Sequence, residues 1–374
     1  MKLAVVNSCC VPHFATKTPT FDTVFGNSGN AVIYDGLRNL LPSEPHLVIP
    51  SIFSKSITAY CKTNSEIIEQ DSILSSLSKC DATILLLQDI LRADAYVTAE
   101  QVSVAMSYIK ASKNLFVFSL GSNSLDFDRS HLFSEISQQI HRSLPVHITE
   151  FMHVLLEKAL LLSVRGEITA GVLRLANLQH FHKISIDGCP SLSGPEIDRS
   201  CLLDSYTNST KELDPFYITG GLFGLKQRRT LLQMCHVAQE KHELNYFFNP
   251  ILARNALSES VFISSTGRKR IFLDPSKWSN WLKSVKESKK NVYYCGTRVH
   301  GCIQALKSGI RGVLLAGDSR ALEMASLYGL SIAPGCYLED VGEIIAEDDI
   351  IEILERQLQL SGNLRRSVGL ISAC

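Results

Sequence analysis

Short apolar runs alternate with longer segments of helical periodicity along most of the chain, and this alternation restricts the fold more than any other feature. The short runs have the length and composition of strands buried on both faces of a sheet. Strands that alternate with helices form parallel sheets covered by helices, so the sequence predicts parallel α/β layers. In the first half the expected strands are Leu3–Val6, His46–Ile49, Ala82–Leu87, Asn114–Ser119, Leu160–Val164 and Lys183–Ile186.

The alternation starts again after Asp198–Asp214, a polar stretch that is typical of a linker. The first-half helices include Asn30–Leu41, Thr98–Ala111 and Glu167–Ala176. The second-half strands are Phe216–Thr219, Leu244–Phe248, Arg270–Leu273, Asn291–Cys295 and Gly312–Ala316. The second-half helices are Lys226–Lys241, Ser276–Glu287, Val299–Ser308, Ser319–Leu327 and Asp348–Leu360. Pro275 is favoured in a first helical turn, and Gly309 and Gly329 are typical helix stops.

The length of 374 residues favours two cores rather than one. We therefore expect two Rossmann-like, doubly wound α/β domains, residues 1–200 and 212–335, followed by a helical tail, residues 336–374. Ligands of such folds bind beyond the carboxyl ends of the strands, so a cleft between the domains is the expected binding site.

Lysine plus arginine and aspartate plus glutamate both total 37, so the net charge is zero and no nucleic-acid partner is indicated. The 11 cysteines are odd in number and include no CxxC pair, which favours reduced thiols over disulfides. His180 and His182 have no third ligand nearby and are expected to be an exposed pair rather than a metal site. The first residues predict a strand rather than a signal peptide, and no apolar stretch reaches the length of a membrane span. We expect a cytoplasmic protein with no metal and no cofactor.

The segment Gly296–Gly301 joins an expected strand to an expected helix and has the residues of an anion site. A helix N-terminus offers unpaired N–H groups and partial positive charge, and Arg298 adds a planar fork suited to phosphate or carboxylate. His300 adds a side chain that gains or loses a proton near neutral pH. We expect His300 to be catalytic and Thr297, Arg298, Val299 and Gly301 to bind the ligand.

A second segment, Ser163–Thr169, repeats the pattern of a strand that ends in an arginine and a glycine before a helix. Arg165 and Arg298, facing one cleft from two domains, would suit a ligand with two negative groups. Two further segments could line that cleft. The first contributes Asn27, Ser28, Gly29 and Asn30, in a glycine loop that is neither a Walker A loop nor a GxGxxG motif, and the second contributes Arg320 and Glu323.

Gly188-Cys189-Pro190-Ser191 follows the expected strand Lys183–Ile186 and raises the question of a cysteine nucleophile. A nucleophilic thiol needs a base close to it, and no companion histidine stands at an obvious position. We therefore expect a tight turn at a strand end.

Taken in order, these segments resemble the polysaccharide pyruvyl transferase family, over about Asn7 to Leu330. The segments that carry the resemblance are Gly26–Ile33, Ser163–Ala170, Gly188–Leu192, Trp278 and Trp281, Gly296–Gly301, and Asp318–Ala325. The chain departs from the family at Asn30, where many members carry aspartate. The resemblance implies two Rossmann-like domains in a GT-B-like arrangement. It also implies transfer of the pyruvyl unit of phosphoenolpyruvate to hydroxyls of a sugar or polysaccharide, as in the biosynthesis of exopolysaccharide and cell-surface glycans.

In that reaction a pyruvate ketal forms and phosphate leaves. The resemblance implies that Arg298 and its helix hold the donor and that His300 supplies the acid, with Arg165 well suited to help hold the donor's charges. The partners would be phosphoenolpyruvate and a glycan acceptor, with at most peripheral membrane contact through a lipid-linked acceptor.

Three other functions are compatible with parts of the pattern. A GT-B glycosyltransferase with a nucleotide-sugar donor would use Glu323 to bind a ribose. A non-catalytic carbohydrate-binding protein would not need a proton donor beside an anion site. An NAD-dependent oxidoreductase is disfavoured because no GxGxxG follows the first strand.

Overall fold

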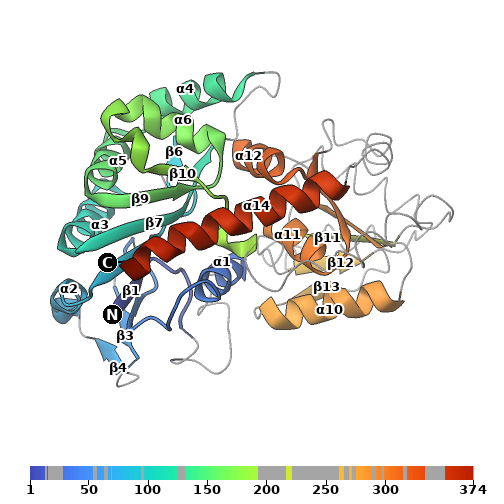
Figure 1. Ribbon diagram of the computed structural model, residues 1–374, viewed down its shortest axis with the longest axis horizontal. Helices are drawn as coiled ribbons and strands as arrows, with labels where there is room; N and C mark the ends of the chain where they lie inside the picture. The colour runs from blue at the N-terminus through green and yellow to red at the C-terminus, as the bar shows by residue number, and fades with distance from the viewer. Residues whose placement is uncertain are drawn as a thin grey trace.

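The computed structural model describes residues 1–12, 15, 28–53, 57–62, 66–68, 70–93, 97–124, 131–192, 216–220, 261–264, 269–271, 275–288, 292–296, 299–314, 318–332 and 350–373. Within these ranges the chain forms a mixed α/β structure around one large, mostly parallel sheet and a second, smaller sheet (Figure 1).

The large sheet has its strands in the order β10-β9-β7-β5-β1-β2-β3-β4. Their bounds are β1 Leu3–Val6, β2 Leu47–Ile49, β3 Ala59–Cys61, β4 Glu66–Ile68, β5 Ala82–Leu86, β7 Asn114–Leu120, β9 Ala159–Val164 and β10 Ile184–Ile186. All pairs from β10 to β2 are parallel, and β3 and β4 extend the sheet in antiparallel fashion. The chain leaves β1 toward β2 on one side and returns to β5 on the other. This reversal of strand order is where doubly wound sheets bind ligands.

Both faces of the large sheet are buried, as the continuous apolar strands predict. Successive residues of β1 alternate between two hydrophobic clusters, with Leu3 and Val5 in one and Ala4 and Val6 in the other. Helices α3 (Ala99–Ala111), α5 (Val146–Lys158) and α6 (Glu167–Ala176) contribute to the cluster that contains Ala4 and Val6. Helix α1 (Ser28–Arg38) contributes to the other.

The smaller sheet has the order β13-β12-β11-β14-β15-β16. Its strands are β11 Phe216–Gly220, β12 Val261–Ser264, β13 Lys269–Ile271, β14 Val292–Gly296, β15 Arg311–Leu314 and β16 Ser331–Ile332. The pairs among β11, β14, β15 and β16 are parallel, and β12 and β13 are antiparallel. Helices α10 (Pro275–Ser288), α11 (Val299–Lys307) and α12 (Ser319–Tyr328) belong to this half.

One hydrophobic cluster joins the two halves. It holds Leu3 of β1 together with Trp278 of α10 and Ile303 of α11. The C-terminal helix α14 (Ile350–Gly369) returns toward the large sheet and places Leu364 in the same cluster (Figure 1). The helical tail expected from the sequence is therefore part of a core shared with β1.

Most of the expected elements are confirmed to within a few residues, including α6 at both ends. Three expectations need correction. Helix α1 begins at Ser28, so part of the expected glycine loop is helical. The alternation of His180-Phe181-His182 predicts the start of a strand, but these residues lie in a 3₁₀ helix, η1 (Leu178–Lys183). Helix α14 runs to Gly369 instead of ending at Leu360. Three expected segments lie wholly outside the described residues: the linker Asp198–Asp214, the helix Lys226–Lys241 and the strand Leu244–Phe248.

Helices α2 (Gln70–Ser78) and α4 (Phe133–Ser143) complete the large half. No helix among the described residues is long and apolar enough to cross a membrane.

Candidate functional site

Four neighbouring strands of the large sheet each deliver one functional side chain at or just beyond their carboxyl ends. Asp89 follows β5, Ser119 lies near the end of β7, Arg165 follows β9, and Cys189 follows β10. Because β5, β7, β9 and β10 are adjacent and parallel, these side chains meet along one edge of the sheet. His300, from the first turn of α11 in the smaller half, joins them, and we call these five residues the Arg165–His300 cluster.

Arg165 is the centre of the cluster and is only 1% exposed. Its Nε donates to Ser119 Oγ at 3.0 Å, and its Nη1 donates to Asp89 Oδ1 at 2.5 Å. Its Nη2 is buried and has no hydrogen-bond partner among the described residues. A buried guanidinium nitrogen without a partner is costly, so this atom is available to an anionic ligand.

Asp89 binds a second guanidinium, that of Arg320, whose Nη1 donates to its Oδ2 at 2.5 Å. Burial alone would raise the pKa of Asp89, but Arg320 and Arg165 outweigh burial and hold it below the usual value. Arg320 also reaches Asp318 at 3.2 Å, and Asp318 caps α12 by accepting from the Ala321 N–H. Arg320, expected to reach a ligand, thus forms an ion pair between α12 and the large sheet.

Cys189 has the companion histidine that the sequence did not reveal. Its Sγ lies 3.6 Å from His300 Nε2 and 3.4 Å from Ser119 Oγ. The expectation of a tight turn is confirmed, since Gly188 has φ +80° and η2 (Pro190–Leu192) follows at once. The expectation that no histidine accompanies the thiol is wrong.

The charges around Cys189 favour its thiolate. Burial alone would raise its pKa, but Arg165 and the hydrogen bond from His300 act more strongly and lower it from 9.0 to about 6. The Cys189 N–H donates to Tyr328 Oη at 2.5 Å, which fixes the backbone at this point. A pKa of about 6 favours the thiolate of Cys189 at neutral pH, beside the ring of His300.

Ser119 links the two parts of the cluster and has an unusual backbone. Its φ is +62°, and its hydroxyl contacts both Arg165 and Cys189. Because Arg165 Nε donates to this oxygen, the hydroxyl proton is free to point to the sulfur. Non-glycine residues with positive φ cost energy and cluster at functional sites.

Glu323, expected to line the cleft, caps a helix of the other half instead. Its two carboxylate oxygens accept from the Thr169 N–H at 2.6 Å and the Thr169 hydroxyl at 2.9 Å. The N-terminus of α6, which the sequence suggested for an anionic ligand, is thus occupied by this carboxylate. Burial raises the pKa of Glu323 from 4.5 to about 7.

The remaining expected site residues fall into four groups. Asn27, Thr297 and Arg298 lie outside the described residues, and Ser28 and Gly29 form the first turn of α1. Asn30 is buried, and its Oδ1 accepts a hydrogen bond from Gln88 Nε2 at 2.5 Å. Gln88 directly precedes Asp89 in the sequence. Val299 is buried, and a Cβ at Gly301 would overlap the Tyr294 hydroxyl, so Gly301 packs against the smaller sheet.

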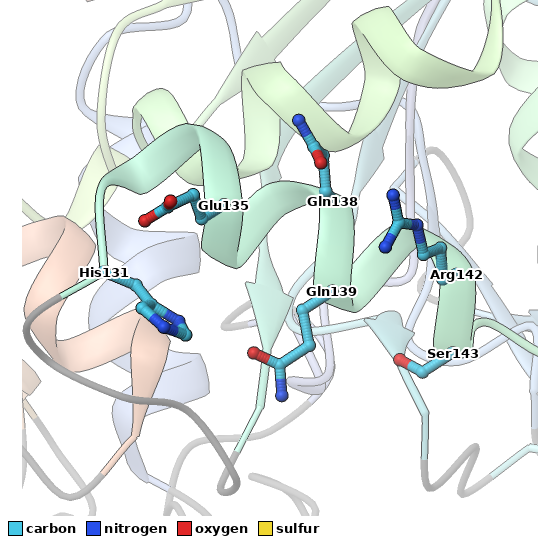
Figure 2. A pocket seen from close by; sticks show the side chains of 6 residues that line it. All are labelled: His131, Glu135, Gln138, Gln139, Arg142 and Ser143. Carbon is cyan, nitrogen blue, oxygen red and sulfur yellow. The ribbon is translucent and has the colours of Figure 1, made fainter.

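A surface hollow elsewhere on the molecule is lined by α4 and the residues just before it (Figure 2). Its lining consists of His131, Glu135, Gln138, Gln139, Arg142 and Ser143. None of them belongs to the Arg165–His300 cluster, and a hollow along the side of one helix offers no convergent groups to a substrate. Among the described residues, no three His, Cys, Asp or Glu side chains are grouped as metal ligands.

The known proteins offered no independent assignment: a comparison with models of protein families and a search of curated proteins each found no match.

Proposed function

We propose that the chain is a cytoplasmic pyruvyl transferase that moves the three-carbon unit of phosphoenolpyruvate onto two hydroxyls of a sugar. In this proposal the expected Rossmann-like halves have a GT-B-like arrangement, with the donor held where their strand ends meet. The observation that carries the proposal is the buried Arg165 guanidinium with an unpartnered Nη2, in a cluster that also holds the imidazole of His300.

Phosphoenolpyruvate has a phosphate and a carboxylate close together, so its recognition needs several cationic donors. Arg165 Nη2 would bind one of these groups, and Arg298 with the N-terminus of α11 would bind the other. Each charge-assisted hydrogen bond would contribute about 1.5–3 kcal/mol. Arg165 and His300 are only 1% and 4% exposed, so the donor could not reach them without a local opening. In this proposal the opening breaks contacts between α12 and the large sheet, such as the Arg320–Asp89 ion pair.

His300 would act as the general acid that protonates the terminal carbon of the enol. The central carbon then becomes electrophilic, and a sugar hydroxyl adds to it. Phosphate leaves, and a second hydroxyl closes the ketal. A positioned acid of this kind accelerates such a step by about 10²–10⁴-fold.

The direct test is incubation with phosphoenolpyruvate and a panel of glycans, following phosphate release and the mass of an added pyruvyl unit. We expect His300→Ala to lose turnover by about 10²-fold or more while it retains donor binding in calorimetry. His182→Ala, on the exposed η1, is the matched control and should behave like wild type. Wild-type turnover in His300→Ala would remove His300 from the mechanism.

Donor binding is tested by replacing each guanidinium with a point charge. Arg165→Lys and Arg298→Lys should both weaken binding, because an ammonium cannot reproduce the planar fork. Arg174→Lys, on the exposed side of α6, is the control for Arg165→Lys. Equal binding by all three variants would exclude a guanidinium site for the donor.

The nucleotide-sugar alternative has less support. It assigned Glu323 to a ribose, and that carboxylate is engaged by Thr169. Thermal stabilisation by UDP- or GDP-sugars, but not by phosphoenolpyruvate, would restore this alternative.

A further inference from the structure

Cys189 is the one reactive group of the cluster that the proposed mechanism does not use. It is fully buried, 3.6 Å from His300 Nε2 and 3.4 Å from Ser119 Oγ. The same serine oxygen accepts from Arg165 Nε, so a single hydroxyl separates the thiol from the guanidinium assigned to the donor. A thiol beside an imidazole is the arrangement of an activated cysteine nucleophile.

The turn that carries Cys189 is fixed from several directions. Gly188 has φ +80°, and a Cβ there would press against Tyr328, whose hydroxyl accepts from the Cys189 N–H. Asp187 accepts from the hydroxyls of Ser185 at 2.6 Å and of Ser367, in α14, at 2.7 Å. These contacts hold the sulfur in one position, which a reaction at a defined carbon requires.

The ionisable groups around the sulfur come from four elements. The end of β9 supplies Arg165, and α11 supplies His300 and Lys307, whose Nζ donates to Ser191 O at 3.0 Å. On the negative side, Asp89 is paired with two arginines, and Glu323 carries only part of its charge near neutral pH because burial raises its pKa to about 7. Tyr328 stays neutral as well because burial raises its pKa well above the usual value. The balance of nearby charge is therefore positive, which favours the thiolate.

We propose that Cys189 is a nucleophile that holds the three-carbon unit covalently between the two hydroxyl additions, with His300 as its proton partner. This inference rests on the proposed function, because it takes phosphoenolpyruvate as the donor. The imidazolium of His300 gives its proton to C3 while Sγ bonds to C2, so the C2=C3 double bond becomes a single bond. The product is a thioether-linked adduct that still carries its phosphate.

The adduct is resolved in two displacements at C2. The first sugar hydroxyl replaces phosphate, which leaves with the hydroxyl proton. The second hydroxyl replaces sulfur, its proton returns to His300, and the thiolate is regenerated. A ketal needs two successive additions at one carbon, and a covalent link prevents loss of the unit to water between them.

The experiment mixes the full-length protein with phosphoenolpyruvate in the absence of acceptor, quenches it in acid, and measures the intact mass and the modified peptide. We expect an added mass of one phosphoenolpyruvate on the Cys189 peptide of the wild type. Cys189→Ala should show no adduct and should lose ketal formation by about 10²-fold or more. Cys302→Ala, which removes an equally buried thiol from α11, should form the adduct as the wild type does.

Four outcomes overturn the inference. If Cys189→Ala forms the ketal at a rate within a few fold of wild type, the thiol takes no part in the reaction. The proposed function still holds in that case, because the wild type forms the ketal. A large loss of turnover in Cys189→Ala, with no adduct on the wild type under rapid quench, makes Cys189 a positioning residue. An adduct on a different cysteine excludes Cys189 as the attacking group. Absence of donor binding and turnover in a folded wild type refutes the proposed function itself.

A second measurement does not depend on the donor. The thiolate of Cys189 is measured as the difference in ultraviolet absorbance between the wild type and Cys189→Ala. This difference should increase with pH, with a midpoint near the Cys189 pKa of about 6. His300→Ala should move that midpoint upward, because the hydrogen bond and positive charge are lost. A midpoint near 9 in the wild type would show an ordinary thiol and contradict the inference.

Discussion

Glu323→Gln is expected to stabilise the protein at alkaline pH, although it removes a charge from a hydrogen-bonded pair. The carboxylate is 1% exposed, and burial raises its pKa from 4.5 to about 7. A group with a raised folded pKa contributes stability that is complete below the unfolded pKa and is lost as pH rises through the folded pKa. The wild type should therefore lose stability between about pH 4.5 and pH 7, while the glutamine variant does not titrate there.

The size of the effect follows from the shift. At 1.36 kcal/mol per pKa unit, the advantage of Glu323→Gln over wild type should grow by about 2 kcal/mol between pH 5 and pH 8. At pH 5 the two proteins should be nearly equal. The glutamine Oε1 still accepts from the Thr169 N–H, and its Nε2 donates to the Thr169 hydroxyl, which can turn to receive it.

Urea unfolding at pH 5 and pH 8 measures this difference directly. Glu167→Gln is the control, because Glu167 is an exposed carboxylate in the first turn of α6. It should change the unfolding free energy by no more than about 0.5 kcal/mol at either pH. If the difference in unfolding free energy between Glu323→Gln and wild type is the same at both pH values, burial does not raise the pKa of this carboxylate and the reasoning fails.

Two further substitutions test how the cluster is held. Gly188→Ala should lower the free energy of unfolding by at least about 1–2 kcal/mol, which is the cost of the left-handed backbone for a residue with a Cβ. Displacement of Tyr328 by the new Cβ should add to this loss. Urea unfolding measures the change, and an unchanged midpoint would contradict the positive φ. Asp89→Asn should cost about 3 kcal/mol at pH 7, because the buried guanidinium of Arg165 loses its charge partner. That loss should shrink as pH falls below about 4, because Asp89 then binds a proton in the unfolded chain while its lowered pKa keeps it ionised in the folded protein. A difference that stays constant with pH would show that the charge is unimportant.

The fold was predictable where the apolar pattern is strong and local. The buried strands β1, β5 and β7 are continuous apolar runs, and α6 begins directly after the Arg165-Gly166 step. The hairpin of β3 and β4 was missed because each strand has three residues, too few to establish a period of two. The extent of α14 was underestimated because its second half is fixed by packing on the shared core.

Arg165 and His300 were singled out from the sequence, but Asp89 and Ser119 were not, and Cys189 was expected to lie in a turn without a companion histidine. Arg165 stands out because it directly follows the strand β9, and His300 because it lies in the first turn of the helix that comes after β14. The pairing of Cys189 with His300 spans 111 positions and depends on how the two halves meet, which no local spacing encodes. For the same reason Arg320 and Glu323 were recognised as unusual, yet their partners in the other half were not. Their contacts with Asp89 and Thr169 span 231 and 154 positions.

Helix α12 makes four separate connections to the half of the molecule that contains the large sheet. Ser319 exchanges hydrogen bonds with Ser124, Arg320 pairs with Asp89, Glu323 caps α6, and Tyr328 accepts from the Cys189 backbone. A one-residue deletion near its start would turn every later side chain by about 100° around the axis. The helix would still satisfy its own backbone, but its later connections would come out of register together. Point substitutions here should accordingly be better tolerated than insertions or deletions, and sequence length in this segment is under tighter constraint than sequence identity.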